Sequence, residues 1–148
     1  MSQTFQFAGG DIAFTHKTGW RGVVYTRFRG STLRSVRIFR DTDLLKTWTS
    51  CPGPIGPTEY IIDGVWDYHY LTKVTVDRVH RIEPRYDSGA CGGPSHVAVN
   101  TFSSGQAIET NVIEEVPGFR CCQWLFDDGG GNFIDVIVVL EDDGGGHG

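Results

Sequence analysis

The chain has 148 residues, of which 39% are hydrophobic and 21% are charged. These values are typical of one globular domain and argue against extensive disorder. The net charge of −5 argues against nucleic-acid binding, because affinity for phosphates depends on positive charge. No run approaches the ~20 apolar residues of a membrane span, and the first residues lack the features of a secretory signal. We therefore expect a soluble protein without a membrane span, either cytoplasmic or secreted by a non-conventional route.

The charges are unevenly distributed along the chain. Seven basic residues and no acid lie between Lys17 and Arg40, whereas the last 28 residues contain six carboxylates and neither lysine nor arginine. This polarity indicates either an anion-binding basic face or two segments that complement each other within or between subunits.

Short apolar and β-branched runs, separated by glycine- and proline-containing turns, predict strands throughout the chain. In chain order the predicted strands are Phe5–Phe7, Ile12–His16, Gly22–Phe28, Leu33–Phe39, Glu59–Asp63, Val65–Tyr70, Lys73–Ile82, Val97–Phe102, Ala107–Glu115, Arg120–Phe126 and Phe133–Glu141. About ten short strands at this spacing predict an all-β fold. We expect a single-domain β-sandwich or jelly roll over residues 1–143, followed by a flexible glycine-rich tail at 144–148.

Side-chain alternation indicates which residues of the predicted strands face the core. Residues 24–28 alternate, so we expect the even-numbered side chains inside and Tyr25, Arg27 and Arg29 outside. The alternation of the run 73–82 changes parity at its middle, which predicts a bulge or a break near Asp77–Arg78.

One segment favours a helix. Asp41–Trp48 begins with a residue suited to an N-cap and then places Leu44, Leu45 and Trp48 in a short apolar stripe. The pattern supports one or two helical turns.

The run Phe133–Leu140 is apolar on both faces apart from Asp135. This composition predicts a strand covered on both sides, by the opposite sheet and by a second subunit, because an exposed edge of this kind would invite aggregation. Homodimerisation through this strand is therefore a hypothesis from the sequence.

The four cysteines show no CxxC spacing, which makes a structural zinc site improbable. Cys121 and Cys122 are adjacent and would point to opposite faces of a strand, so one is expected to be a buried thiol. The other could pair with Cys51 or Cys91, or all four could be small apolar filler.

The turn before the last strand gathers oxygen-bearing side chains. Asp127, Asp128, Asn132 and Asp135 lie within nine residues and enclose three glycines. Carboxylates and backbone carbonyls on a flexible loop are the ligands that calcium prefers, so these four residues are predicted to bind calcium. The spacing is not that of an EF-hand. The alternative is an ordinary Asp/Gly hairpin loop.

The same segment resembles a known family. Phe126-Asp127-Asp128-Gly129, followed by Asn132-Phe133-Ile134-Asp135 and a run of branched apolar residues, resembles the C-terminal segment of bacterial calcium-mediated fucose- and mannose-binding lectins. The family's dense aspartates are thinned to glycine here, and its asparagine before the final aspartate is Ile134. The resemblance implies a β-sandwich dimer or tetramer that binds glycans through calcium, with one ion or none in this chain rather than two.

Aromatic residues supply a second indication of sugar binding. In the predicted strand 65–70, Trp66 and two tyrosines share one face, while Asp67 and His69 share the other. Aromatic faces flanked by hydrogen-bonding groups commonly hold sugar rings, although any single aromatic is more often part of the core. The residues predicted to bind the ligand are Trp20, Trp66, Tyr68, His69 and Tyr70.

We therefore expect a lectin-like carbohydrate-binding protein, homo-oligomeric, with calcium as a hypothetical cofactor and without catalytic activity. One alternative is a small β-barrel enzyme or ligand-binding protein that uses buried pairs, His69 with Asp67 or His80 with Asp77. A third is a protein-interaction module with an anion-binding basic face. No GxSxG, P-loop or HExxH spacing is present in the sequence.

Overall fold

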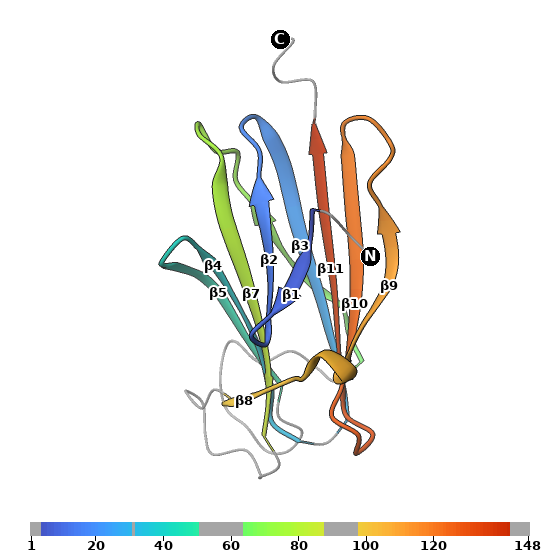
Figure 1. Ribbon diagram of the computed structural model, residues 1–148. Coiled ribbons are helices and arrows are strands. Elements are labelled where there is room, and N and C mark those ends of the chain that lie inside the picture. The colour runs from blue at the N-terminus through green and yellow to red at the C-terminus, as the bar shows by residue number, and fades with distance from the viewer. Residues whose placement is uncertain (1–3, 31, 51–63, 88–97, 143–148) are drawn as a thin grey trace.

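The computed structural model describes residues 4–30, 32–50, 64–87 and 98–142. In these ranges the protein is built almost entirely of strands, which confirms the all-β prediction (Figure 1). The elements are β1 (Gln6–Ala8), β2 (Asp11–His16), β3 (Trp20–Arg29), β4 (Arg34–Arg40), β5 (Asp43–Ser50), β6 (Asp67–Leu71), β7 (Arg78–Tyr86), β8 (Asn100–Thr101), the 3-10 turn η1 (Ser104–Gln106), β9 (Ala107–Ile113), β10 (Phe119–Asp127) and β11 (Phe133–Asp142).

Two antiparallel sheets pack face to face as a β-sandwich (Figure 1). Sheet A has the order β1-β2-β7-β4-β5, with the short β8 also paired to β7, and sheet B has the order β6-β3-β11-β10-β9. Each sheet turns an inner face toward the other sheet and an outer face toward solvent. Within the described ranges the sheets stay separate and do not close into a barrel.

The pairing of β3 with β11 forms the centre of sheet B and extends over the whole length of both strands. The inner-face side chains Ile134, Val136 and Val138 are fully buried. The outer-face side chains of β3 are only partly buried, as the alternation in residues 24–28 predicts. Sheet A thus covers the inner face of β11. Side chains of the neighbouring strands cover part of its outer face, and coverage by a second subunit stays a prediction.

Large aromatic side chains fill the space between the sheets. Trp48 from sheet A and Phe28 and Phe126 from sheet B are fully buried in one continuous core. The rings of Phe102 and Phe126 lie 5.3 Å apart between centroids. Burial of such large side chains contributes most of the favourable free energy of a sandwich core.

The predicted helix at Asp41–Trp48 is wrong. The chain forms a hairpin of β4 and β5 there, and Asp41 occupies the turn with a φ of 52°. A bulge between the two strands shifts their register, and both Leu45 and Trp48 pack toward the core. Because a bulge alters the period-2 alternation, the apolar spacing imitates the stripe of a helix.

The predicted break near Asp77–Arg78 is confirmed, because β7 begins at Arg78 and residues 72–77 form no strand. The predicted strand Glu59–Asp63, the tail 144–148 and any pairing of Cys51 or Cys91 lie outside the described residues. No helix in the described part of the chain is long and apolar enough to cross a membrane.

The backbone at Gly30 gives a test of this architecture. Gly30 ends β3 with a φ of 131°, and a Cβ there would lie 2.8 Å from the Cα of Asn132 and against its side-chain oxygen. We expect Gly30→Ala to lower the free energy of unfolding by about 2 kcal/mol or more, because strain and overlap add. Urea denaturation measures the change.

The control is Gly105→Ala, where the nearest atom would be 3.9 Å from the new Cβ. Its effect should stay within about 0.5 kcal/mol, as for most surface substitutions. Equal effects of the two variants would contradict the described approach of β3 to Asn132.

Candidate functional site

An aromatic patch lies on the outer face of sheet B at its β6 edge. The register of β6 on β3 places Tyr68 opposite Tyr25 and Tyr70 opposite Val23. The rings of Tyr68 and Tyr70 meet edge to face at 5.1 Å, and those of Tyr25 and Tyr68 lie 6.2 Å apart. Trp66, just before β6, adds a third exposed ring. The sequence-predicted residues Trp66, Tyr68 and Tyr70 thus share one surface.

A charged cluster lies beside this patch, in the middle of the outer face. Asp135 of β11 is only 3% exposed, and its carboxylate accepts hydrogen bonds from Arg27 Nε at 3.0 Å and Arg29 Nε at 3.2 Å. The Arg27 guanidinium also lies 4.5 Å from the centroid of the Trp66 ring. A buried carboxylate needs paired cations, and stacking on an aromatic ring orients one of them.

A shallow hollow of about 360 Å³ continues the patch toward the opposite end of β6. Tyr70 forms one wall, and Thr72, Lys73 and Glu141 bring hydrogen-bonding groups to the rim. Arg21 lines the hollow as well and pairs with Glu141 at 3.1 Å. The hollow therefore combines one aromatic ring with several polar groups, which is the composition of a site for a polar ligand with an apolar face.

Trp20 does not belong to this patch. It lies at the start of β3, an even number of residues from the buried Val24, and therefore on the inner face of sheet B. Its ring packs against the core with Lys17 and Arg120 above it. Tyr68 and Tyr70 lie on the outer face, opposite Tyr25 and Val23. The structure thus places Trp20 apart from the other predicted ligand-binding residues.

His69 points to the inner side of β6, opposite Val24. Burial, helped by the nearby charge of Lys46, lowers the pKa of His69 from its ordinary value. Its neighbour Asp67 accepts a hydrogen bond from Trp48 Nε1 at 2.9 Å. The carboxylate therefore holds a core tryptophan, and the predicted pair of His69 with Asp67 is not assembled as an acid–base pair.

The acidic turn forms a hydrogen-bonded hairpin loop. Asp127 accepts a hydrogen bond from the amide of Gly129 at 2.8 Å, and Asp128 accepts from the amide of Gly130 at 2.7 Å and from Asn132 Nδ2 at 3.0 Å. These contacts agree with the alternative prediction of an ordinary Asp/Gly hairpin loop, in which side chains accept hydrogen bonds from backbone amides of the same loop.

Asp135, the fourth predicted calcium ligand, is paired with Arg27 and Arg29 on the outer face. Among the described residues no three His, Cys, Asp or Glu side chains converge in a way that could hold a metal ion. Calcium binding by this segment stays a prediction of the sequence.

The second acid–base pair predicted from the sequence does not form either. Asp77 accepts hydrogen bonds from the backbone and the hydroxyl of Thr18, which lower its pKa. His80 is buried in sheet A, stacked on Phe14 and 5.3 Å from the ring of His16. Burial and the neighbouring histidine lower the pKa of His80 to about 4. His80 is therefore part of the core, and Asp77 lies on the surface.

The basic segment, residues 17–40, does not form one basic face. Arg34 is fully buried and donates to the carbonyl of Thr32 at 2.7 Å, and Arg37 pairs with Glu83 on sheet A. Three ion pairs join the basic segment to the acidic C-terminal one: Arg21 with Glu141, and Arg27 and Arg29 with Asp135. The expected complementarity of the two segments is therefore found within the chain.

Cys121 and Cys122 are both free and buried, on opposite faces of β10. Burial raises the pKa of both thiols, and the hydrogen bond from Cys122 to Glu109 adds to the rise for Cys122. Neither has the lowered pKa of a reactive thiol.

Sequence reasoning did not include Arg27 in the site, although its outward direction was predicted. Only the pairing of β3 with both β6 and β11 shows that Arg27 lies between Trp66 and Asp135. Neither a scan against protein-family models nor a search of curated proteins finds a match to this chain. The lectin resemblance therefore rests on the residues quoted for it.

The buried histidines predict how stability depends on pH. The unfolded state binds a proton on His80 below about pH 6.5, whereas the folded state does so only near pH 4. The contribution of His80 to the free energy of unfolding is therefore fully present above about pH 6.5. It falls by up to about 3 kcal/mol as the pH falls from 6.5 to 4. His80→Phe, which keeps an aromatic ring on Phe14, should remove much of this fall in urea denaturation series. An unchanged slope in the variant would contradict the assignment to His80.

Proposed function

We propose that this protein binds oligosaccharides on the outer face of sheet B, along its β6 edge. The observation that carries the proposal is the exposure of three adjacent rings, with Trp66 at 38%, Tyr68 at 51% and Tyr70 at 67%. A contiguous exposed aromatic patch usually marks an interaction site. Rings of this kind stack on the C–H faces of sugars, and the solvent-exposed hydroxyls of the tyrosines can form hydrogen bonds with sugar hydroxyls.

The polar groups around the rings support a sugar rather than an apolar ligand. Arg27 presents a guanidinium that Asp135 and Trp66 hold in one orientation, so little side-chain entropy is lost when it donates to a hydroxyl. At the other end of the patch, Thr72 and Lys73 line the hollow beside Tyr70 and bring further hydrogen-bonding side chains to its rim.

The dimensions of the patch favour a chain of sugars over a single ring. β6 contains five residues and is therefore roughly 17 Å long, and the hollow at Tyr70 extends the surface further. An elongated open strip of this kind suits an oligosaccharide laid along the strand. The proposal includes no bond-breaking step.

The proposal does not require calcium. The carboxylate of Asp135, beside the aromatic patch, is neutralised by Arg27 and Arg29, and two bound arginines leave no net negative charge there to attract a cation. We therefore expect sugar binding to persist in EDTA, in contrast to what the family resemblance implies.

A glycan array with and without EDTA is the first experiment, followed by calorimetry with the strongest glycan. Tyr70→Ala and Trp66→Ala should each weaken binding by about ten-fold, which corresponds to the ~1.4 kcal/mol expected for one stacking ring. The control is Leu44→Ala, which removes an equally exposed apolar side chain from β5 on the other sheet and should leave binding unchanged.

Absence of binding to every glycan, or equal binding by the double variant Y68A/Y70A, would contradict the proposal. Loss of binding in EDTA together with loss in Asp127→Asn would instead move the site to the acidic hairpin.

The apolar side chains on the β9 half of the same face support a second candidate, a homodimer that buries this face. Ile108 and Ile113 are exposed there, beside Leu125 and Val139. Five strands ~4.8 Å apart, which range from five to ten residues in length, give a face of roughly 700 Å². This is close to the ~800 Å² that each subunit contributes to a standard interface.

Light scattering at micromolar concentration tests this second candidate. The dimer hypothesis predicts twice the chain mass for the wild type and a monomer for Ile113→Lys, because a charge in the interface is not paired. Leu44→Lys, on sheet A, is the control and should stay dimeric. A monomeric wild type would exclude the dimer and leave the sugar proposal standing.

A further inference from the structure

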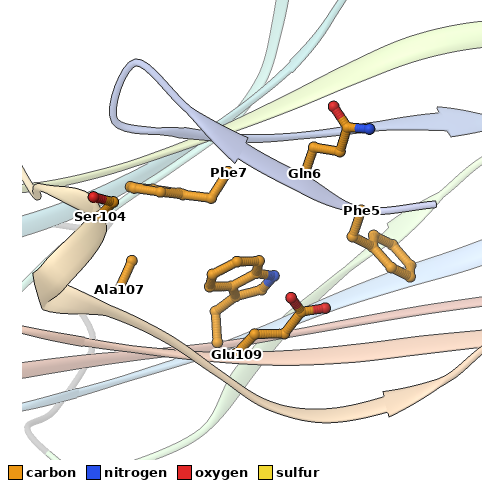
Figure 2. A pocket seen from close by; sticks show the side chains of 7 residues that line it. Phe5, Gln6, Phe7, Ser104, Ala107 and Glu109 are labelled. Carbon is orange, nitrogen blue, oxygen red and sulfur yellow. The ribbon is translucent and has the colours of Figure 1, made fainter. Parts of the chain in front are cut away.

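A cleft lies between the two sheets at the edge far from β6. It has a volume of about 520 Å³ and separates β1, the edge of sheet A, from β9 and β10 of sheet B. Figure 2 shows Phe5, Gln6 and Phe7 on one side of the cleft and Ala107 and Glu109 on the other. A volume of this size falls within the range of small-molecule pockets.

The walls of the cleft are mainly aromatic. Phe5 and Trp124 are almost completely buried, and the ring of Phe7 lies 5.6 Å from that of Trp124. Trp124 is 6% exposed, and its Nε1 hydrogen has no hydrogen-bond partner among the described residues. Leaving such a donor unpaired in the interior costs about 1–3 kcal/mol. A ligand in the cleft that carries a hydrogen-bond acceptor would pair with Trp124 Nε1 and remove this cost.

Glu109 is the one ionisable residue among the seven that line the cleft. A bulge between Gln123 and Trp124 shifts the pairing of β9 with β10 and places Glu109 directly opposite Trp124. Its carboxylate accepts a hydrogen bond from Cys122 Sγ at 3.3 Å, which draws it toward the fully buried Cys122. Bulges commonly re-aim a side chain next to a functional site.

The charge in the lining of the cleft is negative. Glu109 is the one charged group in its lining. Beyond Phe5 the charges are mixed, because Glu114 accepts a hydrogen bond from the amide of Thr4 at 2.7 Å and Lys17 and Arg120 line the adjoining hollow with Thr4. Glu109 is a half-buried carboxylate among aromatic rings. Such a site favours an organic cation with an apolar body, because the positive group pairs with the carboxylate while the apolar part packs against the rings. An anionic ligand would meet repulsion from the same carboxylate.

We propose that this cleft is a second binding site, separate from the sugar-binding face, for a small organic amine whose ammonium group is carried on an aromatic or branched apolar body. The ammonium group pairs with the Glu109 carboxylate. The body packs between Phe7 and Trp124, whose rings also attract the positive charge. A hydroxyl or carbonyl on the ligand accepts the hydrogen of Trp124 Nε1.

The test uses three probes that share a phenyl ring and a benzylic hydroxyl and differ in charge: the amine 2-amino-1-phenylethanol, the alcohol 1-phenylethane-1,2-diol and the carboxylate 3-hydroxy-3-phenylpropanoate. Each is titrated into the ¹⁵N-labelled full chain, and backbone and indole resonances are followed, with the Trp124 indole assigned through Trp124→Phe. We expect the amine to shift the signals of Phe7, Glu109 and Trp124, and to bind at least about ten-fold more tightly than the alcohol, as charge-assisted hydrogen bonds imply.

Glu109→Gln should reduce amine affinity by about ten-fold or more and leave that of the alcohol unchanged. Thermal unfolding of this variant checks that it folds. Tyr70→Ala, on the opposite edge of sheet B, is the matched control and should bind the amine as the wild type does. No shift of the cleft signals with any probe up to its solubility limit would overturn the proposal. Equal affinity for the three probes, insensitive to Glu109→Gln, would overturn it as well.

Discussion

The outer face of sheet B depends on one ion-pair cluster, in which the buried carboxylate of Asp135 is held by Arg27 and Arg29. A carboxylate that is 3% exposed is stable only when its charge is compensated. The register of β3 on β11 brings Arg27 directly opposite Asp135, and Arg29 lies two residues further along the same face of β3. The same backbone pairing that builds the sheet therefore also assembles the cluster. The cluster in turn fixes the guanidinium on which Trp66 stacks.

This arrangement divides sheet B into two edges of different chemistry. At the β6 edge, simple alternation turns the aromatic side chains Tyr68 and Tyr70 outward, beside the charged centre. At the β9 edge, a bulge breaks the alternation and turns Glu109 inward beside Trp124. A regular strand thus builds the open surface for which we propose sugar binding, and an irregular one builds the acidic cleft for which we propose amine binding. The two proposed sites share a sheet and no lining residue.

The sequence predicted the strand content, the outward direction of Arg27 and the shared face of the β6 aromatics, because these follow from period-2 alternation. It could not predict which strands are neighbours, and so did not show that Asp135 meets two arginines. The bulge opposite β4 misled the assignment of Asp41–Trp48 as a helix. The cleft at Glu109 was missed for the same reason, since a bulge reverses the face on which a residue lies.

The most direct test of this account is to map where a bound oligosaccharide lies. The measurement is a titration of the labelled protein with the strongest glycan in chelating buffer, followed through tyrosine ring, tryptophan indole and arginine side-chain resonances. The account predicts shifts of Trp66, Tyr68 and Tyr70 together with the Nε–H of Arg27. Shifts confined to residues 127–132, or seen only after calcium is added, would contradict it.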